Sequence, residues 1–245
     1  MLWHKAWRES QARFLLSALA IVGLCGGFVV FHREGAAGIS DQPLTYVEYI
    51  WEIVYRGYLR EMFILFSLLL GFGGLLRERD HGTAGFTLAL PISRLRLVSV
   101  RAGVGLSEVA GLSLLPGLVI LSLSPLVGQS YPWSQALKFA ILWASGGAFF
   151  FVIGFLASSV FYGEFTALGA GFLGLILYSV IADLPGLEQY SLDIHDIMSG
   201  KGMPYFQPHG ALLVGPLPWM ALAGIVVISL GLIGLAYRIT ERRDF

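Results

Sequence analysis

Two apolar runs stand back to back in residues 139–181, FAILWASGGAFFFVIGFLASSVFYGEFTALGAGFLGLILYSVI, with Glu164 as their one charged side chain. A helix of about 20 mostly apolar residues, with a range of about 17–25, crosses a bilayer. The runs cover about residues 139–161 and 165–181 and are separated only by residues 162–164. The stretch therefore predicts two membrane-spanning helices joined as a tight hairpin.

The same length criterion finds four further spans along the chain. The six predicted spans cover about residues 14–31, 58–76, 102–127, 139–161, 165–181 and 217–237. Apolar residues make up 56% of the 245 residues, charged residues make up 13%, and the mean hydropathy is +0.73. This composition excludes a water-soluble monomer, because it leaves too few polar side chains to cover a globule. We expect an all-α membrane protein with one transmembrane domain over residues 1–245.

Basic residues are unevenly distributed across the predicted topology. Six alternating spans put both termini and the loop between the second and third spans on one side, which carries eleven Lys and Arg residues against five on the other. The positive-inside rule makes the richer side cytoplasmic. The formal net charge is zero, which argues against nucleic acid as a partner, because nucleic-acid binding needs a basic excess.

The first 13 residues carry an amphipathic pattern. Trp3 and Trp7 are four positions apart, whereas Lys5 and Arg8 point elsewhere on a helix. This pattern is typical of a short helix that lies on the cytoplasmic face of the membrane, in contact with lipid. The alternative is a frayed basic anchor in front of the first span.

Two outer segments are expected to contain short helices. In the first outer loop, Tyr46, Ile50 and Val54 recur every four residues, which predicts a helix along the outer interface. The outer segment before the last span, residues 182–216, contains four prolines, and Pro218 follows closely; these prolines divide it into short pieces.

The same outer segment carries four residue types that bind metals, Asp193, His195, Asp196 and His209. Residues two apart do not share a helix face, so an Asp-x-His-Asp sequence does not bring its ligands together on a helix. We expect a solvated polar loop and no metal site.

The cytoplasmic loop between the second and third spans, residues 77–101, reads RERDHGTAGFTLALPISRLRLVSVR. Gly82 is suited to end the preceding helix, and Thr83 to cap a short helix through about Leu90. Pro91 stops that helix, and Ser93 is placed to cap the next one. Apolar residues of the short helix predict either a docking surface or a re-entrant turn packed on this chain's own helices.

This loop resembles the signature of ABC-2 type transporter permeases. Two short patterns carry the resemblance: Glu78-x-x-x-Gly82-Thr83, and Leu88-x-Leu90-Pro91-x-Ser93-Arg94. The basic N-terminal helix, the long outer segment before the last span and the short cytoplasmic tail are similar as well. In that family this segment follows the second of six spans and carries a coupling helix that docks into an ATP-binding subunit.

The resemblance implies a function, partners and site residues. The chain would be the permease subunit of an ABC transporter, more an exporter than an importer, in a bacterial-type plasma (inner) membrane. It would form the pathway as a dimer with a second or homologous permease, driven by a cytosolic ATP-binding subunit. The coupling element would comprise Glu78, Gly82, Thr83, Leu90, Pro91, Ser93 and Arg94. Each of these residues also has a simpler role, such as a turn, a cap or a lipid anchor.

The chain itself lacks the motif of an ATPase. No G-x-x-x-x-G-K-[ST] sequence occurs, so ATP and Mg²⁺ are expected on the partner subunit, with no cofactor and no enzymatic activity in this chain. No G-x-S-x-G, H-E-x-x-H or C-x-x-C motif occurs either.

Two acidic residues lie in or beside the spans. Glu108 is inside the third span, where an ionisable residue is a candidate functional site. A milder interpretation pairs its carboxylate with Arg101 or Arg77 at the interface. Glu164, in the turn between the fourth and fifth spans, faces either an ATPase subunit or solvent.

Two other function classes remain open. A self-sufficient secondary transporter or channel predicts coupling-ion carboxylates and broken helices near the midplane. A membrane scaffold or accessory subunit is the third possibility. Glu108 should be the most sensitive position in the secondary transporter.

Overall fold

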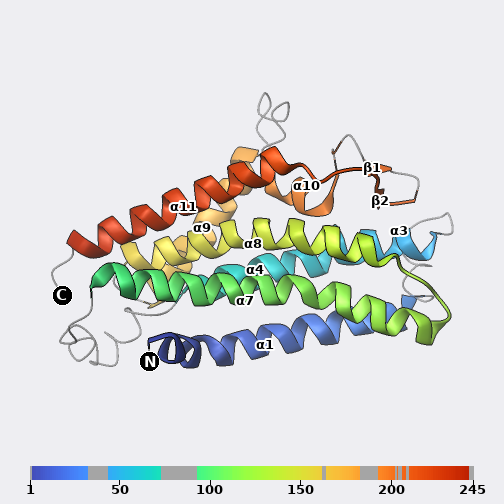
Figure 1. Cartoon of the computed structure of the whole chain (residues 1–245), viewed down its shortest axis with the longest axis horizontal. Helices are drawn as coiled ribbons and strands as arrows, with labels where there is room; N and C mark the ends of the chain where they lie inside the picture. Colours follow the sequence, from blue (N-terminus) through green and yellow to red (C-terminus); the bar gives the residue numbers. More distant parts are fainter. Residues whose placement is uncertain are drawn as a thin grey trace.

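The computed structural model describes residues 2–32, 44–72, 93–161, 164–182, 193–201, 203, 206–207 and 210–242. Its helices, in chain order, are α1 (Leu2–Val30), α3 (Tyr46–Ile50), the π-helix η1 (Trp51–Tyr55), α4 (Tyr58–Gly71), α7 (Arg94–Leu123), the 3₁₀ helix η2 (Ser124–Val127), α8 (Trp133–Val160), α9 (Glu164–Ala182), α10 (Ile194–Ser199) and α11 (Trp219–Arg242). An antiparallel hairpin pairs β1 (Phe206–Gln207) with β2 (Leu212–Leu213). The long helices form a bundle with both chain termini at one end and α3 and the hairpin at the other (Figure 1).

Four of the described helices are long and apolar enough to cross a membrane. They are Leu2–Val30, Leu95–Val127, Trp133–Val160 and Trp219–Glu241. The expectation of an all-helical architecture is confirmed for the bundle, and the chain is a multi-pass membrane protein with four candidate spans. The β1–β2 hairpin is an addition that the sequence pattern did not predict.

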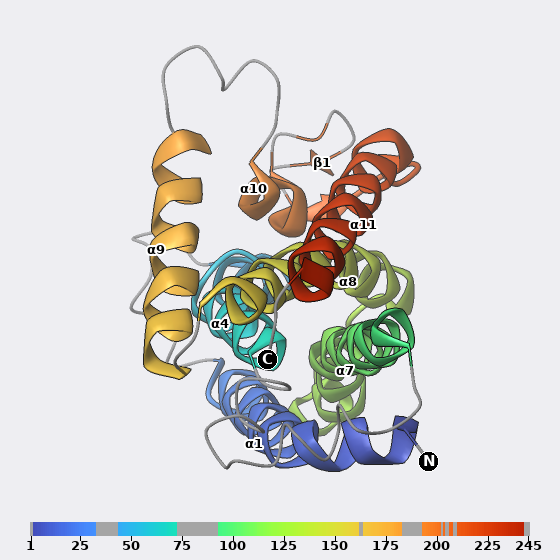
Figure 2. The ribbon, with the colours of Figure 1, turned by 90° about the vertical axis from the view of Figure 1, so that its left-hand side faces the viewer.

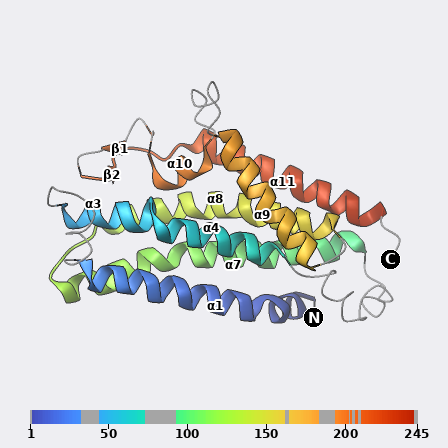
Figure 3. The ribbon, with the colours of Figure 1, turned by 180° about the vertical axis from the view of Figure 1, so that it is seen from behind.

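The other two expected spans are shorter helices. α4 has 14 residues, a length of about 21 Å, and ends where Phe72 adopts an extended conformation. The apolar part of α9 is Phe165–Ile181. α9 runs at a slant across the bundle, in the foreground of Figure 3.

α8 lies at the centre of the bundle. In the most apolar 18 residues of α8, 61% of the residues are buried, against 22% in the same stretch of α1 and of α11. α8 packs against α4, α7, α9 and α11. The outer faces of α1 and α11 expose apolar side chains such as Leu16, Leu19, Val227 and Leu230. In a bilayer these faces contact lipid tails, which are as apolar as leucine.

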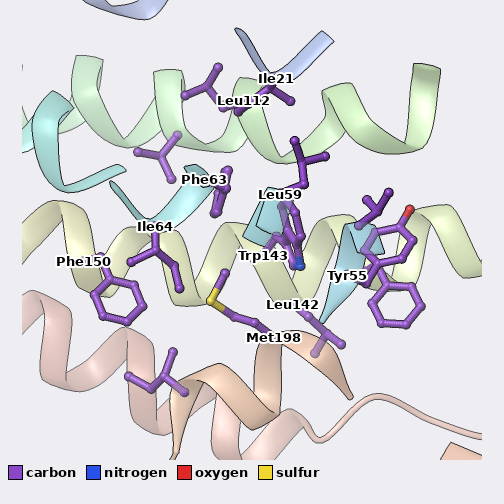
Figure 4. Packing of buried hydrophobic residues seen from close by; sticks show 14 of the residues in the cluster. Ile21, Tyr55, Leu59, Phe63, Ile64, Leu112, Leu142, Trp143, Phe150 and Met198 are labelled. Atoms are coloured by element: carbon purple, nitrogen blue, oxygen red, sulfur yellow. The ribbon is translucent and has the colours of Figure 1, made fainter. Parts of the chain in front are cut away.

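The core between α4, η1 and α8 is aromatic. Trp143 is fully buried, and its ring centroid lies 4.8 Å from that of Phe63 and 5.7 Å from that of Tyr55 (Figure 4). Tyr55 also stacks on Phe139 at 4.0 Å. Gly147, one turn beyond Trp143, leaves room for Phe63, because a Cβ there would lie 2.7 Å from the Phe63 ring. The core therefore depends on an alternation of large rings and glycine along α8.

The amphipathic pattern suggested a separate N-terminal helix, but the structure has none, because this segment is part of α1. α1 is helical without interruption from Leu2 to Val30. Its first turns, darkest blue in Figure 2, run across the end of the bundle before the helix turns along it. Trp3 and Trp7 remain exposed, as expected for an interfacial segment, whereas Ala6 is buried against Val100 and Val104 of α7.

The end of the bundle that holds α3 and the hairpin is closely packed. The helix predicted from Tyr46, Ile50 and Val54 is confirmed as α3 and η1, and Ile50 and Val54 are buried in the core. Gln135 of α8 accepts from Leu213 N at 3.1 Å and donates to Leu213 O at 3.0 Å. This pair of bonds fixes the hairpin on α8.

Candidate functional site

Most of the residues of the predicted coupling element lie outside the described residues. These are Glu78, Gly82, Thr83, Leu90 and Pro91. Ser93 is described and confirms its predicted role, because it is the N-cap of α7 and its side chain accepts from Arg96 N. Arg94 is the first residue of α7. Glu164 is likewise the first residue of α9, so its contact with an ATPase subunit or solvent stays a prediction.

The Ser93 cap joins residues 73–92 directly to a helix of 30 residues. α7 begins at the end of the bundle that also holds both termini (Figure 1). It packs against α1, α4, α8 and α11 along its length. A displacement at Ser93 therefore acts on a helix about 45 Å long, with Pro116 in its interior, that touches most of the bundle.

Glu108 is the one acidic residue of α7, and only 2% of its surface is exposed. The Ser10 hydroxyl of α1 donates to Glu108 Oε1. The predicted pairing of Glu108 with Arg101 is wrong, because Arg101 instead bonds to Glu9 Oε2 at 3.4 Å. The other predicted partner, Arg77, lies outside the described residues.

Arg13 supplies positive charge beside Glu108. Its Nη1 donates to Leu69 O at the end of α4, at 3.0 Å, and its guanidinium attracts the Glu108 carboxylate. The sequence analysis had not connected Ser10 or Arg13 with Glu108. Both residues lie on the side of α1 that also carries buried Ala6 and Ser17.

A cavity of about 40 Å³ opens beside Glu108. Its charged lining comes from Glu9, Arg13, Arg101 and Glu108, and its apolar lining includes Leu70, Phe72, Phe151 and Phe155. Two positive and two negative side chains thus share a small space between α1, α4, α7 and α8.

A second polar cluster lies at the start of α10, where the expectation of a solvated loop is wrong because residues 194–199 form a helix. Asp193 is the N-cap of α10 and therefore precedes its first turn. Its Oδ1 lies 2.8 Å from the backbone N of His195 and 3.0 Å from the His195 Nδ1. The His195 ring packs against Phe150 and Tyr178. Arg60 of α4 donates to His195 O at 3.0 Å.

This cluster anchors α10 to the bundle. Tyr178 of α9 accepts a bond from Ile194 N, and Trp51 of η1 donates to Ser199 O. Among the residues that the structure describes, no three His, Cys, Asp or Glu side chains are placed to hold a metal ion, and His209 lies outside them. The geometry assigns the cluster to helix capping and packing.

Asp193 should make the stability of the protein depend on pH. Burial raises the pKa of Asp193, but hydrogen bonds and charge from His195, with the charge of Arg60, outweigh burial and lower it. A carboxyl group whose pKa is lowered in the folded state stabilises the fold at pH values above its unfolded pKa of about 3.9. This contribution to stability is lost as the pH falls through the folded-state pKa. Asp193→Ala should therefore cost about 1 kcal/mol at pH 7, the value of an N-cap, and this cost should shrink as the pH falls through the folded-state pKa of Asp193. Thermal unfolding of both proteins from pH 7 to pH 3 measures this difference.

Asp196 provides the control for this titration. Its pKa is raised by burial and by the charge of Asp193. A raised carboxyl pKa means that the ionised form destabilises the fold, so Asp196→Ala should be neutral or stabilising at pH 7. A loss of stability in Asp196→Ala equal to that of Asp193→Ala would contradict the assignment.

Similarity to known proteins gives these residues no further assignment. The Ser93 cap, the Ser10–Glu108 bond and the Asp193–His195 pair are features of this chain's own geometry. No protein-family model matches the chain, and no curated protein matches its sequence.

Proposed function

We propose that the chain is the permease subunit of an ABC transporter of the ABC-2 type, an exporter driven by a separate ATP-binding subunit. One observation supports the proposal most directly. Ser93 caps α7 and Arg94 begins it, so the last two residues of the Leu88–Arg94 pattern stand at the start of a helix of 30 residues.

Transmission along α7 requires rigid contacts, and α7 has them. Val109 of α7 and Phe63 of α4 both lie against Gly147 of α8, and Leu112 is fully buried in the same core. Packed interfaces of this density move as bodies and switch between discrete arrangements. Closure of an ATPase dimer on residues 78–94 would therefore shift α7 and its neighbours together and change the open side of the pathway.

The proposal treats α4 and α9 as two further spans, which gives six. α9 has 19 residues, a length of about 28 Å, which approaches the hydrocarbon thickness of about 30 Å. α4 is preceded by the helical turns of α3 and η1, which extend the same region toward the outer end. Six spans form half of a pathway, so a second permease copy or a homologous permease completes it.

Basic residues support a cytoplasmic location for the end that holds the termini. Lys5, Arg8, Arg96 and Arg238 lie near that end, on α1, α7 and α11. ATP and Mg²⁺ would bind the partner subunit there. This chain's residues would receive movement and would not act on the nucleotide.

The secondary-transporter alternative receives little support from Glu108. Such transporters bind their coupling ions near the bilayer midplane, at broken helices. Glu108 instead lies beside Ser10 and Arg13 and beside the end of α4 at Gly71, in a stretch of α7 that is helical without a break from Arg94 to Leu123.

A reconstituted complex tests the proposal. The chain is purified gently from its native membranes, and a co-eluting P-loop protein is identified by mass spectrometry. In liposomes that contain both proteins, the double variant Leu90→Ala with Arg94→Ala should lose at least about tenfold of the permease-stimulated ATPase rate, the effect of removing one good interface contact.

The control replaces a matched pair outside the pattern. Leu235 and Arg238 of α11 are exposed and lie toward the same end of the bundle. Leu235→Ala with Arg238→Ala should retain the stimulated rate. Absence of any P-loop partner after crosslinking, or equal activity of both double variants, would overturn the proposal, and a severe transport defect in Glu108→Gln alone would then favour a secondary transporter.

A further inference from the structure

The cavity beside Glu108 contains an unusual polar atom. Among the described residues, Glu108 Oε1 has the Ser10 hydroxyl as a donor, whereas buried Oε2 has no hydrogen-bond partner. A buried carboxylate oxygen without a donor is costly, and such atoms are normally satisfied by protein or by ordered water. The cavity of about 40 Å³ adjoins this carboxylate and exceeds the 10–15 Å³ or so that a water molecule needs.

The surrounding charges suit water better than a bare ion. Arg13 and Arg101 repel a cation, and Glu9 and Glu108 repel an anion, while all four offer donors or acceptors to water. The elements α4 and α8 contribute only apolar side chains and backbone, among them Phe72 and Phe151. Water in this cavity therefore finds polar side chains on the α1 and α7 sides alone.

Further contacts join the same two helices around the cavity. Glu9 bonds to Arg101, and Ala6 packs against Val100 and Val104. The Trp3 ring lies over Gly103, where a Cβ would approach it to 2.9 Å. Residues 3–10 of α1 are thus held along residues 100–108 of α7.

We propose that Glu108, Ser10 and water bound in this cavity form a hydrated polar clasp that fixes the N-terminal turns of α1 to α7. On the proposed function, a movement that enters α7 at Ser93 passes through this clasp into α1. Two helices, and not one, then respond to the ATP-binding subunit. The surface segment with Trp3 and Trp7 is carried along with α7.

Hydrogen exchange tests the clasp on the full chain alone in lipid nanodiscs. Ser10→Ala removes the donor, and Glu108→Gln removes the charge that Arg13 and water stabilise. Each should speed exchange of the amides of residues 2–13 by about tenfold, in line with the loss of a hydrogen bond to a charged group. In the double variant these amides should exchange at about the same rate as in either single variant, because both substitutions break the same set of contacts.

Glu61→Gln is the matched control, since Glu61 is an exposed carboxylate on α4 that pairs with Arg60. Amide exchange of residues 2–13 should be unchanged in this variant. Amide exchange of α8 should be unchanged in Ser10→Ala, Glu108→Gln, their double variant and Glu61→Gln. Unaltered exchange of residues 2–13 in both Ser10→Ala and Glu108→Gln would overturn the clasp.

Hydroxyl-radical footprinting tests the water. Radicals generated by radiolysis oxidise side chains next to bound water, even when bulk solvent does not reach them. Phe151 lines the cavity and Phe150 does not, although both are buried. Phe151 should be oxidised well above Phe150, and equal labelling would show a dry cavity and overturn the hydrated part of the proposal.

The role in transmission has its own test in the reconstituted complex. Ser10→Ala should lower the permease-stimulated ATPase rate about tenfold. Exchange and footprinting need no partner, so a failure of the ABC proposal leaves their outcome intact. An altered exchange with an unaltered ATPase rate would overturn the transmission role.

Discussion

Gly154→Ala should strongly destabilise the protein, because α4 and α8 touch there backbone to backbone. A Cβ on Gly154 would lie 2.3 Å from Leu68 O, and one on Gly71 would lie 2.2 Å from Phe151 O. Backbone atoms inside two packed helices cannot move aside as a flexible side chain does. The helices would have to separate, at a cost of about 3 kcal/mol, the upper part of the range for overpacked cores. Gly71→Ala should behave in the same way.

The midpoint of unfolding by SDS in mixed micelles measures this loss, together with the monodisperse fraction after extraction. Gly231→Ala is the control, because a Cβ there meets no atom within 4 Å. This substitution should stay within about 0.5 kcal/mol of the parent, as for an open surface site. Equal midpoints for Gly154→Ala and Gly231→Ala would show that α4 and α8 are not in close contact.

Hydropathy was sufficient to locate the helices, and their ends depended on local signals. The third predicted span begins at about residue 102, but its helix starts at Arg94, because the Ser93 cap fixes its first turn. The cap had been identified from sequence. The close backbone contact that Gly71, the last residue of α4, makes with α8 involves residues far apart in the chain, and the sequence alone did not predict it.

The N-terminal segment was predicted as a separate helix because its charge pattern differs from that of the first span. Residues 9–14, Glu-Ser-Gln-Ala-Arg-Phe, contain neither glycine nor proline. Nothing in them interrupts helical hydrogen bonding. The surface segment and the spanning segment are therefore one helix, and amphipathicity marked a change of surroundings along it.

The partners of Glu108 show the limit of reasoning along one helix. Arg101 is near in sequence, but it bonds to Glu9, and the donor to Glu108 is Ser10, which lies 98 positions away. The usable signal was the buried side of α1, where Ala6, Ser10 and Ser17 recur at helical spacing. Small and polar residues on one face of a membrane helix indicate the face that packs on another helix.

Asp193 and His195 show a different limit. The argument that residues two apart do not meet holds inside a helix, but Asp193 is the residue before the first turn. An N-cap side chain folds back over the next residues and makes such contacts. The sequence contained this possibility, since aspartate is among the preferred N-cap residues.

Trp143→Ala should also be severely destabilising, whereas Trp143→Phe should be nearly neutral. Trp143 is fully buried between Tyr55 and Phe63, so truncation to alanine leaves a large cavity at a cost of about 3–5 kcal/mol. Its Nε1 is buried and has no hydrogen-bond partner among the described residues. Phenylalanine loses part of the ring contact but removes a donor whose burial costs about 1–3 kcal/mol. The two effects oppose each other and largely cancel.

Trp51 gives the matched comparison, because its Nε1 donates to Ser199 O at 2.8 Å. Trp51→Phe removes a satisfied donor and leaves the Ser199 carbonyl without that bond, so it should lower the stability by about 1–2 kcal/mol. SDS-unfolding midpoints should therefore rank Trp143→Phe above Trp51→Phe and both above Trp143→Ala. If Trp143→Phe lost more stability than Trp51→Phe, the indole of Trp143 would have a hydrogen-bond acceptor in the folded protein. The core of α8 would then be held by polar bonds as well as by ring packing.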